Sequence, residues 1–107
     1  MRTLNVILNG ARGGQGTSTI AAALALYAAG YCTVQLVAID PSGTAALLGI
    51  ADPGDVEVAV TDRLTLTDAP GGEPDVRIVD AGTVAGTRRD GDIHLVVLRG
   101  PCFVPVR

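Results

Sequence analysis

The sequence predicts an α/β fold built on a mostly parallel β-sheet with flanking helices. Short, almost continuous apolar runs recur along the chain at residues 4–8, 34–39, 76–79 and 93–98. Such runs are typical of parallel strands that are buried on both faces. Polar or glycine-containing segments follow the runs, and an alanine-rich segment, residues 18–29, separates the first two. This alternation of strand and helix patterns indicates α/β architecture.

The first strand and the first helix are the clearest elements. Residues 4–8 form the expected strand, and the helix begins at the hydroxyl residue Ser18, continues as AAALALYAA and ends before Gly30, a residue type that favours a helix C-terminus. Because the helix is apolar on nearly all sides, we expect it to be covered on more than one side.

The middle of the chain is read as short elements separated by turns. Residues 34–39 are the second expected strand, followed by a turn at 41–43 and a short helix over 44–48 that ends at Gly49. A Pro/Gly turn is expected at residues 52–55.

The remaining elements are strands. Residues 56–60 and 64–67 predict two short strands or a hairpin, and residues 69–74, APGGEP, predict a flexible loop. The last core strands are expected at 76–79 and 93–98, separated by a Gly/Arg/Asp-rich segment.

Length and composition predict a single domain over residues 1–107 with a packed aliphatic core. The chain is 48% hydrophobic with three aromatic residues, and a chain of this size buries roughly two-thirds of its unfolded surface. It has no lysine, eight dispersed arginines and a net charge of −3, so autonomous DNA binding is not expected.

We expect a cytoplasmic protein without membrane attachment. The sequence contains no signal peptide, no apolar run of about 20 residues and no terminal amphipathic helix. Cys32 and Cys102 lack metal-ligand spacing and are expected to be reduced thiols, although a disulfide stays possible.

Residues 9–19, NGARGGQGTST, predict an anion-binding loop. They connect an expected strand to a helix N-terminus, where converging backbone N–H groups and the helix dipole favour phosphate. A usual P-loop has a lysine immediately before its hydroxyl residue, and Thr17 occupies that position. The loop therefore lacks its usual cation.

This segment resembles the deviant Walker A loop of the ParA/MinD group of ATPases, KGGxGK(T/S)(T/S). In that alignment Arg12 falls on the signature lysine, Thr17 on the Walker lysine and Ser18 on the magnesium-binding hydroxyl. The other aligned positions are Gly13, Gly14, Gln15, Gly16 and Thr19.

Three later motifs follow in the order of the same family. VAIDPSG is similar to its DxDPxG segment, with Asp40 on the aspartate that orients the attacking water and Ala38 replacing the first aspartate. VRIVDAG resembles the Walker B strand, with Asp80 on the magnesium-associated aspartate. IHLVVLRGP resembles the next core strand.

The resemblance implies a P-loop NTPase-like fold of the SIMIBI type, reduced in size. It implies ATP or ADP with Mg²⁺ as cofactor, bound by residues 12–19, with Ser18 and Asp80 on the metal and Asp40 as catalytic residue if the protein is active. Since Thr17 carries no charge, weak or absent hydrolysis is expected. The implied role is protein interaction in a partitioning or positioning system, with or without nucleotide. The implied partner is a second copy, an intact ParA/MinD-type ATPase or its regulator.

Two alternatives stay open at this point. The protein could be an active small ATPase that uses Arg12 in place of the Walker lysine, or a pure interaction module that never binds nucleotide. Asp40 and Asp80 could equally stabilise turns, the Arg88–Arg89 pair could be a solvated loop charge, and His94 is expected to be a packed or edge histidine. A sheet face left without helices would favour dimerisation.

Overall fold

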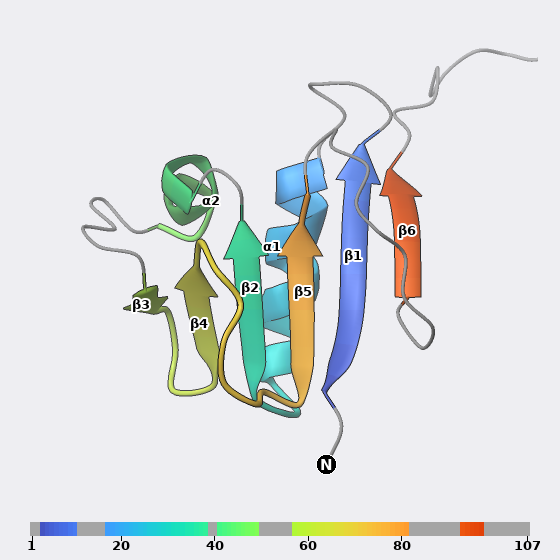
Figure 1. The fold of residues 1–107 in the computed structure, drawn as a ribbon. Helices are drawn as coiled ribbons and strands as arrows, with labels where there is room; N and C mark the ends of the chain where they lie inside the picture. Colours follow the sequence, from blue (N-terminus) through green and yellow to red (C-terminus); the bar gives the residue numbers. More distant parts are fainter. Residues whose placement is uncertain (1–2, 11–16, 39–40, 50–56, 82–92, 98–107) are drawn as a thin grey trace, which may run out of the picture.

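A computed structural model of the chain describes residues 3–10, 17–38, 41–49, 57–81 and 93–97. Within them the predicted α/β fold is confirmed: two helices accompany one six-stranded sheet of order β3-β4-β2-β5-β1-β6 (Figure 1). The elements are β1 (Leu4–Gly10), α1 (Thr17–Ala29), β2 (Val34–Ala38), α2 (Pro41–Leu47), β3 (Glu57–Ala59), β4 (Leu64–Thr67), β5 (Val76–Asp80) and β6 (Ile93–Val97).

The sheet is parallel except at one end. β5 lies between β1 and β2 and is parallel to both, and β6 and β4 extend the parallel sheet on either side. β3 pairs antiparallel with β4, which confirms the predicted hairpin and makes the sheet mixed. As a result, β1, β2 and β5 all end at the same edge of the sheet, where ligands of open α/β sheets commonly bind.

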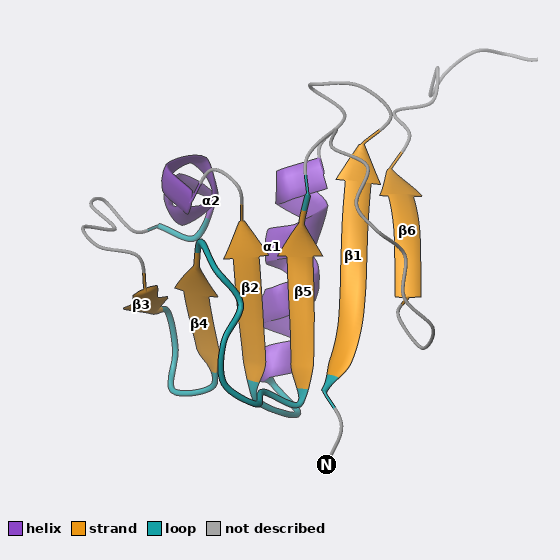
Figure 2. Ribbon diagram, viewed as in Figure 1, coloured by secondary structure: helices purple, strands orange, loops and turns teal. Residues whose placement is uncertain are grey.

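The core lies between α1 and one face of the sheet (Figure 2). Small residues of α1 (Ala21, Ala25 and Ala29) let the helix lie close to the strands, whose leucine and isoleucine side chains fill the space between. The buried cluster consists of Leu8, Ala21, Ala25, Ala29, Val34, Leu36, Ala38, Ala45, Leu64, Leu66 and Ile78.

The expected burial of the strands on both faces is correct only for β2. All five residues of β2 are buried, whereas Asn5 and Ile7 of β1 and Arg77 and Val79 of β5 are half-buried. The reason is that α1 and α2 pack on the same face, since Ala45 of α2 belongs to the same cluster as the α1 alanines.

Two boundaries at the first crossover differ from the prediction. β1 continues through Asn9 and Gly10, which we assigned to the glycine-rich loop, because these residues pair with β6. α1 begins one residue earlier than predicted, at Thr17. Gly30 follows α1 without the left-handed backbone of a glycine cap, and its N–H instead donates to Tyr27 O at 3.2 Å.

The turn expected at residues 41–43 is in fact the first turn of α2. Pro41 occupies the first helical position, where a missing N–H costs nothing and its fixed φ suits the helix. The helix ends at Leu47, one residue earlier than predicted, and Gly49 follows with a φ of 80°, the left-handed conformation typical of a helix stop. The turn predicted at 52–55 lies outside the described residues.

The loop between β4 and β5 is a loop as predicted, but hydrogen bonds hold it against the sheet. Gln35 of β2 donates from Nε2 to Gly71 O at 2.9 Å, and Arg77 of β5 donates to the carbonyls of Gly71 and Gly72 at 3.1 Å. Arg77 also donates to Gln35 Oε1 at 2.7 Å and to Asn5 Oδ1 at 3.3 Å. The expectation of a flexible loop is therefore corrected to a tethered one.

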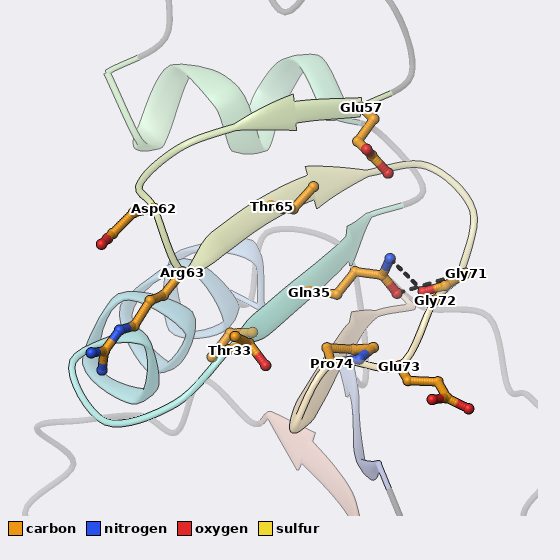
Figure 3. Close-up of a pocket in the computed structure, with 11 residues that line it drawn as sticks. Thr33, Gln35, Glu57, Asp62, Arg63, Thr65, Gly71, Gly72, Glu73 and Pro74 are labelled. Atoms are coloured by element: carbon orange, nitrogen blue, oxygen red, sulfur yellow. Dashed lines mark hydrogen bonds between the residues drawn. The ribbon is translucent and has the colours of Figure 1, made fainter.

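We expect Arg77→Met to lower the free energy of unfolding by about 1.5–3 kcal/mol, because the variant keeps the side-chain volume and loses charge-assisted hydrogen bonds. Urea unfolding measures the loss, and amide exchange of Gly71 and Gly72 should accelerate in the variant. Arg63→Met is the matched control, since the exposed Arg63 side chain extends away from this network (Figure 3). Equal stability of the two variants would contradict the tether.

A second link joins the starts of β2 and β5. Asp75 Oδ2 accepts hydrogen bonds from Thr33 N at 3.1 Å and from Thr33 Oγ1 at 3.0 Å, and Asp75 N donates back to Thr33 Oγ1 at 3.0 Å. The backbone N–H of Thr33 and, next, its hydroxyl lower the pKa of the Asp75 carboxyl below its usual 3.8.

This lowered pKa predicts an acid-sensitive contribution to stability. The folded state holds the Asp75 proton less tightly than the unfolded state, so the contribution is complete above the usual pKa and disappears as the pH falls through the lower folded value. Urea unfolding between pH 5 and pH 2 should show this loss in the native protein, a smaller loss in Thr33→Val and none of this component in Asp75→Asn. An unchanged acid profile in Asp75→Asn would contradict the assignment.

Candidate functional site at the carboxyl edge of the sheet

A hydroxyl and a carboxylate meet where β5 ends and α1 begins. Ser18 Oγ donates to Asp80 Oδ2 at 2.6 Å, although the two residues are 62 positions apart. Asp80 is the last residue of β5 and is 5% exposed, and Ser18 is the second residue of α1. These are the two residues that the sequence assigned to Mg²⁺.

The topology explains this meeting. β5 pairs in parallel with β1, with Leu8 opposite Asp80, so the end of β5 lies beside the end of the strand that leads into α1. Side chains alternate along a strand, and Ile78 of β5 belongs to the core under α1. Asp80, two residues later, therefore faces the same helix.

The electrostatic setting suits an anion and a hard cation. The first N–H groups of α1 lack intrahelical partners, and the helix N-terminus carries partial positive charge close to the Asp80 carboxylate. Mg²⁺ prefers oxygen ligands and is usually held by one or two carboxylates together with substrate phosphates and water. Ser18 Oγ and Asp80 Oδ2 supply that donor set at adjacent positions, so the residues present fit a magnesium–phosphate ligand. The described part of the chain holds no cluster of three or more His, Cys, Asp or Glu side chains suited to a metal.

The other residues assigned to nucleotide divide into two groups. Thr17 is the first residue of α1 and is 8% exposed, and Thr19 is exposed. Thr17 thus places a neutral hydroxyl at the start of α1, where a usual P-loop has the positively charged lysine side chain. The remaining predicted residues, Arg12, Gly13, Gly14, Gln15, Gly16 and Asp40, lie outside the described residues.

Sequence reasoning missed a polar contact between β1 and β6. His94 Nε2 lies 2.6 Å from Asn9 Oδ1, and an amide oxygen accepts, so Nε2 is the donor when it carries the proton. Neighbouring side chains of a strand lie on opposite faces of the sheet, and Leu8 packs under α1. The contact between Asn9 and His94 therefore lies on the face opposite to Asp80. The expectation of an edge histidine is confirmed, since β6 ends the described sheet. The sequence signal for this contact was the presence of two polar residues, Asn9 and His94, in or next to apolar strand segments.

A cavity of about 350 Å³ lies beside β2 and β4, between the hairpin of β3 and β4 and the loop that joins β4 to β5 (Figure 3). It contains none of the predicted site residues. Its lining consists of Thr33, Val34, Gln35, Glu57, Asp62, Arg63, Thr65, Gly71, Gly72, Glu73 and Pro74. Gln35 and Gly71 are engaged with one another there, and the side chains of Asp62 and Arg63 extend away from them. The polar side chains that line the cavity therefore do not converge on one position where a ligand could bind.

Comparison with known proteins identifies no relative of this chain. No family model matches the chain, and neither a curated protein nor a solved structure matches it. No helix among the described residues combines the length and apolar character needed to cross a membrane.

Proposed function

We propose that this chain is a degenerate ParA/MinD-like P-loop protein that binds Mg²⁺–nucleotide weakly and hydrolyses it slowly or not at all. The observation that carries the proposal is the 2.6 Å hydrogen bond between Ser18 and Asp80. In the resembled family these positions share a magnesium ion. Ser18 and Asp80 are 62 positions apart, and each belongs to a motif that the resemblance links to magnesium.

The arrangement of the strands supports the same proposal. A strand, a glycine-rich connection and a helix N-terminus follow one another at β1 and α1, and the neighbouring parallel strand β5 brings its terminal carboxylate to that helix. Phosphate bound by backbone N–H groups at a helix start would lie next to a metal held by this pair.

Thr17 explains why the protein is proposed to be a weak binder and a poor enzyme. A lysine at this position contributes a charge-assisted contact to phosphate, worth about 1.5–3 kcal/mol, or roughly ten- to a hundredfold in affinity. Phosphoryl transfer depends on positive charge around the transferring group, which the Thr17 hydroxyl does not supply.

The protein would then act through its contacts with other proteins. We propose a cytoplasmic role in a partitioning or positioning system, as a homodimer or as a partner of an intact ParA/MinD-type ATPase or its regulator. Nucleotide, where bound, would bias these contacts and would not drive turnover.

Calorimetry with Mg·ADP and Mg·ATP tests this proposal. We expect weak binding to the native chain and a ten- to hundredfold gain in Thr17→Lys. Thr19→Lys is the matched control, because it adds the same charge two positions later at an exposed residue. Thermal unfolding of each variant checks that lysine at the buried Thr17 position leaves the fold intact.

Absence of binding to both the native chain and a folded Thr17→Lys variant would refute the proposal. The loop would then be a structural connection. An equal gain from Thr19→Lys would show that added charge, and not the Walker position, attracts the nucleotide.

A further inference from the structure

The outer face of α1 is apolar and exposed. Tyr27 and Tyr31 are 70% and 74% exposed, and Ile20 and Leu24 are exposed as well. With Ala23 they follow helical spacing along one side of α1 and just beyond its end. We call Ile20, Ala23, Leu24, Tyr27 and Tyr31 the α1 stripe. Among the described residues only the alanine side of α1 is covered, so there the expectation that α1 is covered on more than one side is not met.

The stripe is uncharged, and it is large for an exposed apolar patch. α1, TSTIAAALALYAA, contains no charged residue, and a helix that is hydrophobic all round is normally buried. At about 150–250 Å² per aromatic side chain, the two tyrosines alone expose roughly 200–350 Å². The exposed aliphatic residues bring the patch to roughly 500 Å², near the upper end of the largest patch on a typical monomer.

We propose that a second copy of this chain covers the α1 stripe through a two-fold helix–helix contact. A standard interface buries about 800 Å² per partner, so the patch and a modest rim around it suffice for a dimer of low to standard size. Because the stripe is uncharged, two copies of a chain with net charge −3 can meet there without placing like charges together.

The order of residues in the stripe fits such a crossing. Ala23 stands between the larger residues Ile20 and Tyr27, so two helices can approach to the usual 8–10 Å at this point. In a two-fold contact, residue i of one copy contacts residue j of the other, and residue j of the first copy contacts residue i of the second. The Tyr27–Tyr31 pair, whose ring centroids are 5.4 Å apart, would then pack beside Ile20 of the second copy.

This interface would specify the homodimer named under the proposed function, but it does not depend on nucleotide binding. Ser18 and Asp80 meet on the sheet side of α1, whereas the stripe is on the opposite side. Association through the stripe is expected with or without nucleotide, so a failure of the nucleotide proposal leaves this inference standing, and the reverse also holds.

Sedimentation equilibrium across a concentration series tests the dimer. We expect the native mass to rise from 10.8 kDa toward twice that value at micromolar concentrations. Leu24→Glu should weaken association at least about thirtyfold, since it places two carboxylates in an apolar contact. Leu95→Glu is the matched control: Leu95 on β6 is 42% exposed and Leu24 is 36% exposed. Leu95→Glu should associate like the native chain.

Tyrosine fluorescence gives a local readout of the same event. Tyr27 and Tyr31 are the only tyrosines, and the chain has no tryptophan, so intrinsic emission reports on the stripe alone. Quenching by acrylamide should decrease as the native protein is concentrated and should stay constant in Leu24→Glu. A native chain that stays at 10.8 kDa would overturn the inference, as would dissociation by Leu95→Glu and not by Leu24→Glu.

A cross-link decides the matter if Leu24→Glu fails to fold. Ala23→Cys, in a chain with Cys32→Ser and Cys102→Ser, should form an intermolecular disulfide on oxidation, because the crossing brings the two Cα atoms within reach of about 7 Å. Ala59→Cys, at an exposed position of β3, is the control and should stay monomeric. No cross-link at Ala23 would overturn the proposed crossing.

Discussion

Leu36→Ala is expected to lower the free energy of unfolding by about 2–5 kcal/mol. Leu36 is fully buried in the middle of β2, in register with Leu66 of β4 and Ile78 of β5. Truncation removes apolar atoms from the centre of the core and leaves a cavity. α1 already contacts the sheet through alanines, so it has little freedom to move inward and fill the space.

Urea unfolding of the two proteins measures this loss. Leu95→Ala is the matched control, because the same truncation at an exposed leucine of β6 should change stability by less than about 1 kcal/mol. A domain is typically stable by 5–15 kcal/mol, so the core variant should shift the midpoint strongly. A loss at Leu36 no larger than the loss at Leu95 would mean that β2 is not the centre of the core.

The elements could be predicted because their signals are local. The apolar runs that became β1, β2, β5 and β6 are almost continuous, and the hairpin of β3 and β4 is marked by Thr61, whose Oγ1 accepts hydrogen bonds from the N–H groups of Arg63 and Leu64. The meeting of Ser18 and Asp80 was also predictable. It requires only motif positions and the rule that parallel strands end at one edge.

Features that depend on distant partners could not be predicted. Asn9 and Gly10 look like loop residues, and they become strand because β6, more than 80 positions later, pairs with them. The 68–75 loop has a flexible composition, yet Arg77 and Gln35 hold it from neighbouring strands. Gln35 lies 36 positions before Gly71. Arg77 is near the loop in sequence, but its place beside Gln35 is set by the register of β2 and β5.

The outer side of α1 shows a different limit. The composition of α1 shows a helix that is apolar on nearly all sides. The apolar character of Ile20, Leu24 and Tyr27 predicts burial without saying what buries them. Within the single chain nothing described covers these residues. The exposure of these residues, where burial was predicted, is the observation on which the proposed dimer is based.

Asp80→Asn is expected to weaken Mg²⁺–nucleotide binding about ten- to a hundredfold while changing the free energy of unfolding by less than about 1 kcal/mol. Asparagine keeps the shape of the side chain, and its amide oxygen can still accept the hydrogen bond from Ser18 Oγ. It loses the negative charge that makes a carboxylate a good magnesium ligand. Binding and stability should therefore separate in this variant.

Ser18→Ala should behave differently. Removing the hydroxyl takes the 2.6 Å hydrogen bond from a carboxylate that is only 5% exposed, so we expect a loss of about 1–3 kcal/mol of stability together with weaker Mg²⁺-dependent binding. Thr19→Ala, at the exposed neighbouring position, is the control and should change neither quantity.

Calorimetry of ADP binding with Mg²⁺ and with EDTA isolates the role of the metal. For the native chain the affinity should be higher with Mg²⁺, and for Asp80→Asn the two affinities should become equal, because the variant loses the ligand and keeps the helix N-terminus that holds phosphate. If instead the native affinity is the same in Mg²⁺ and in EDTA, the pair formed by Ser18 and Asp80 joins β5 to α1 and serves only the fold.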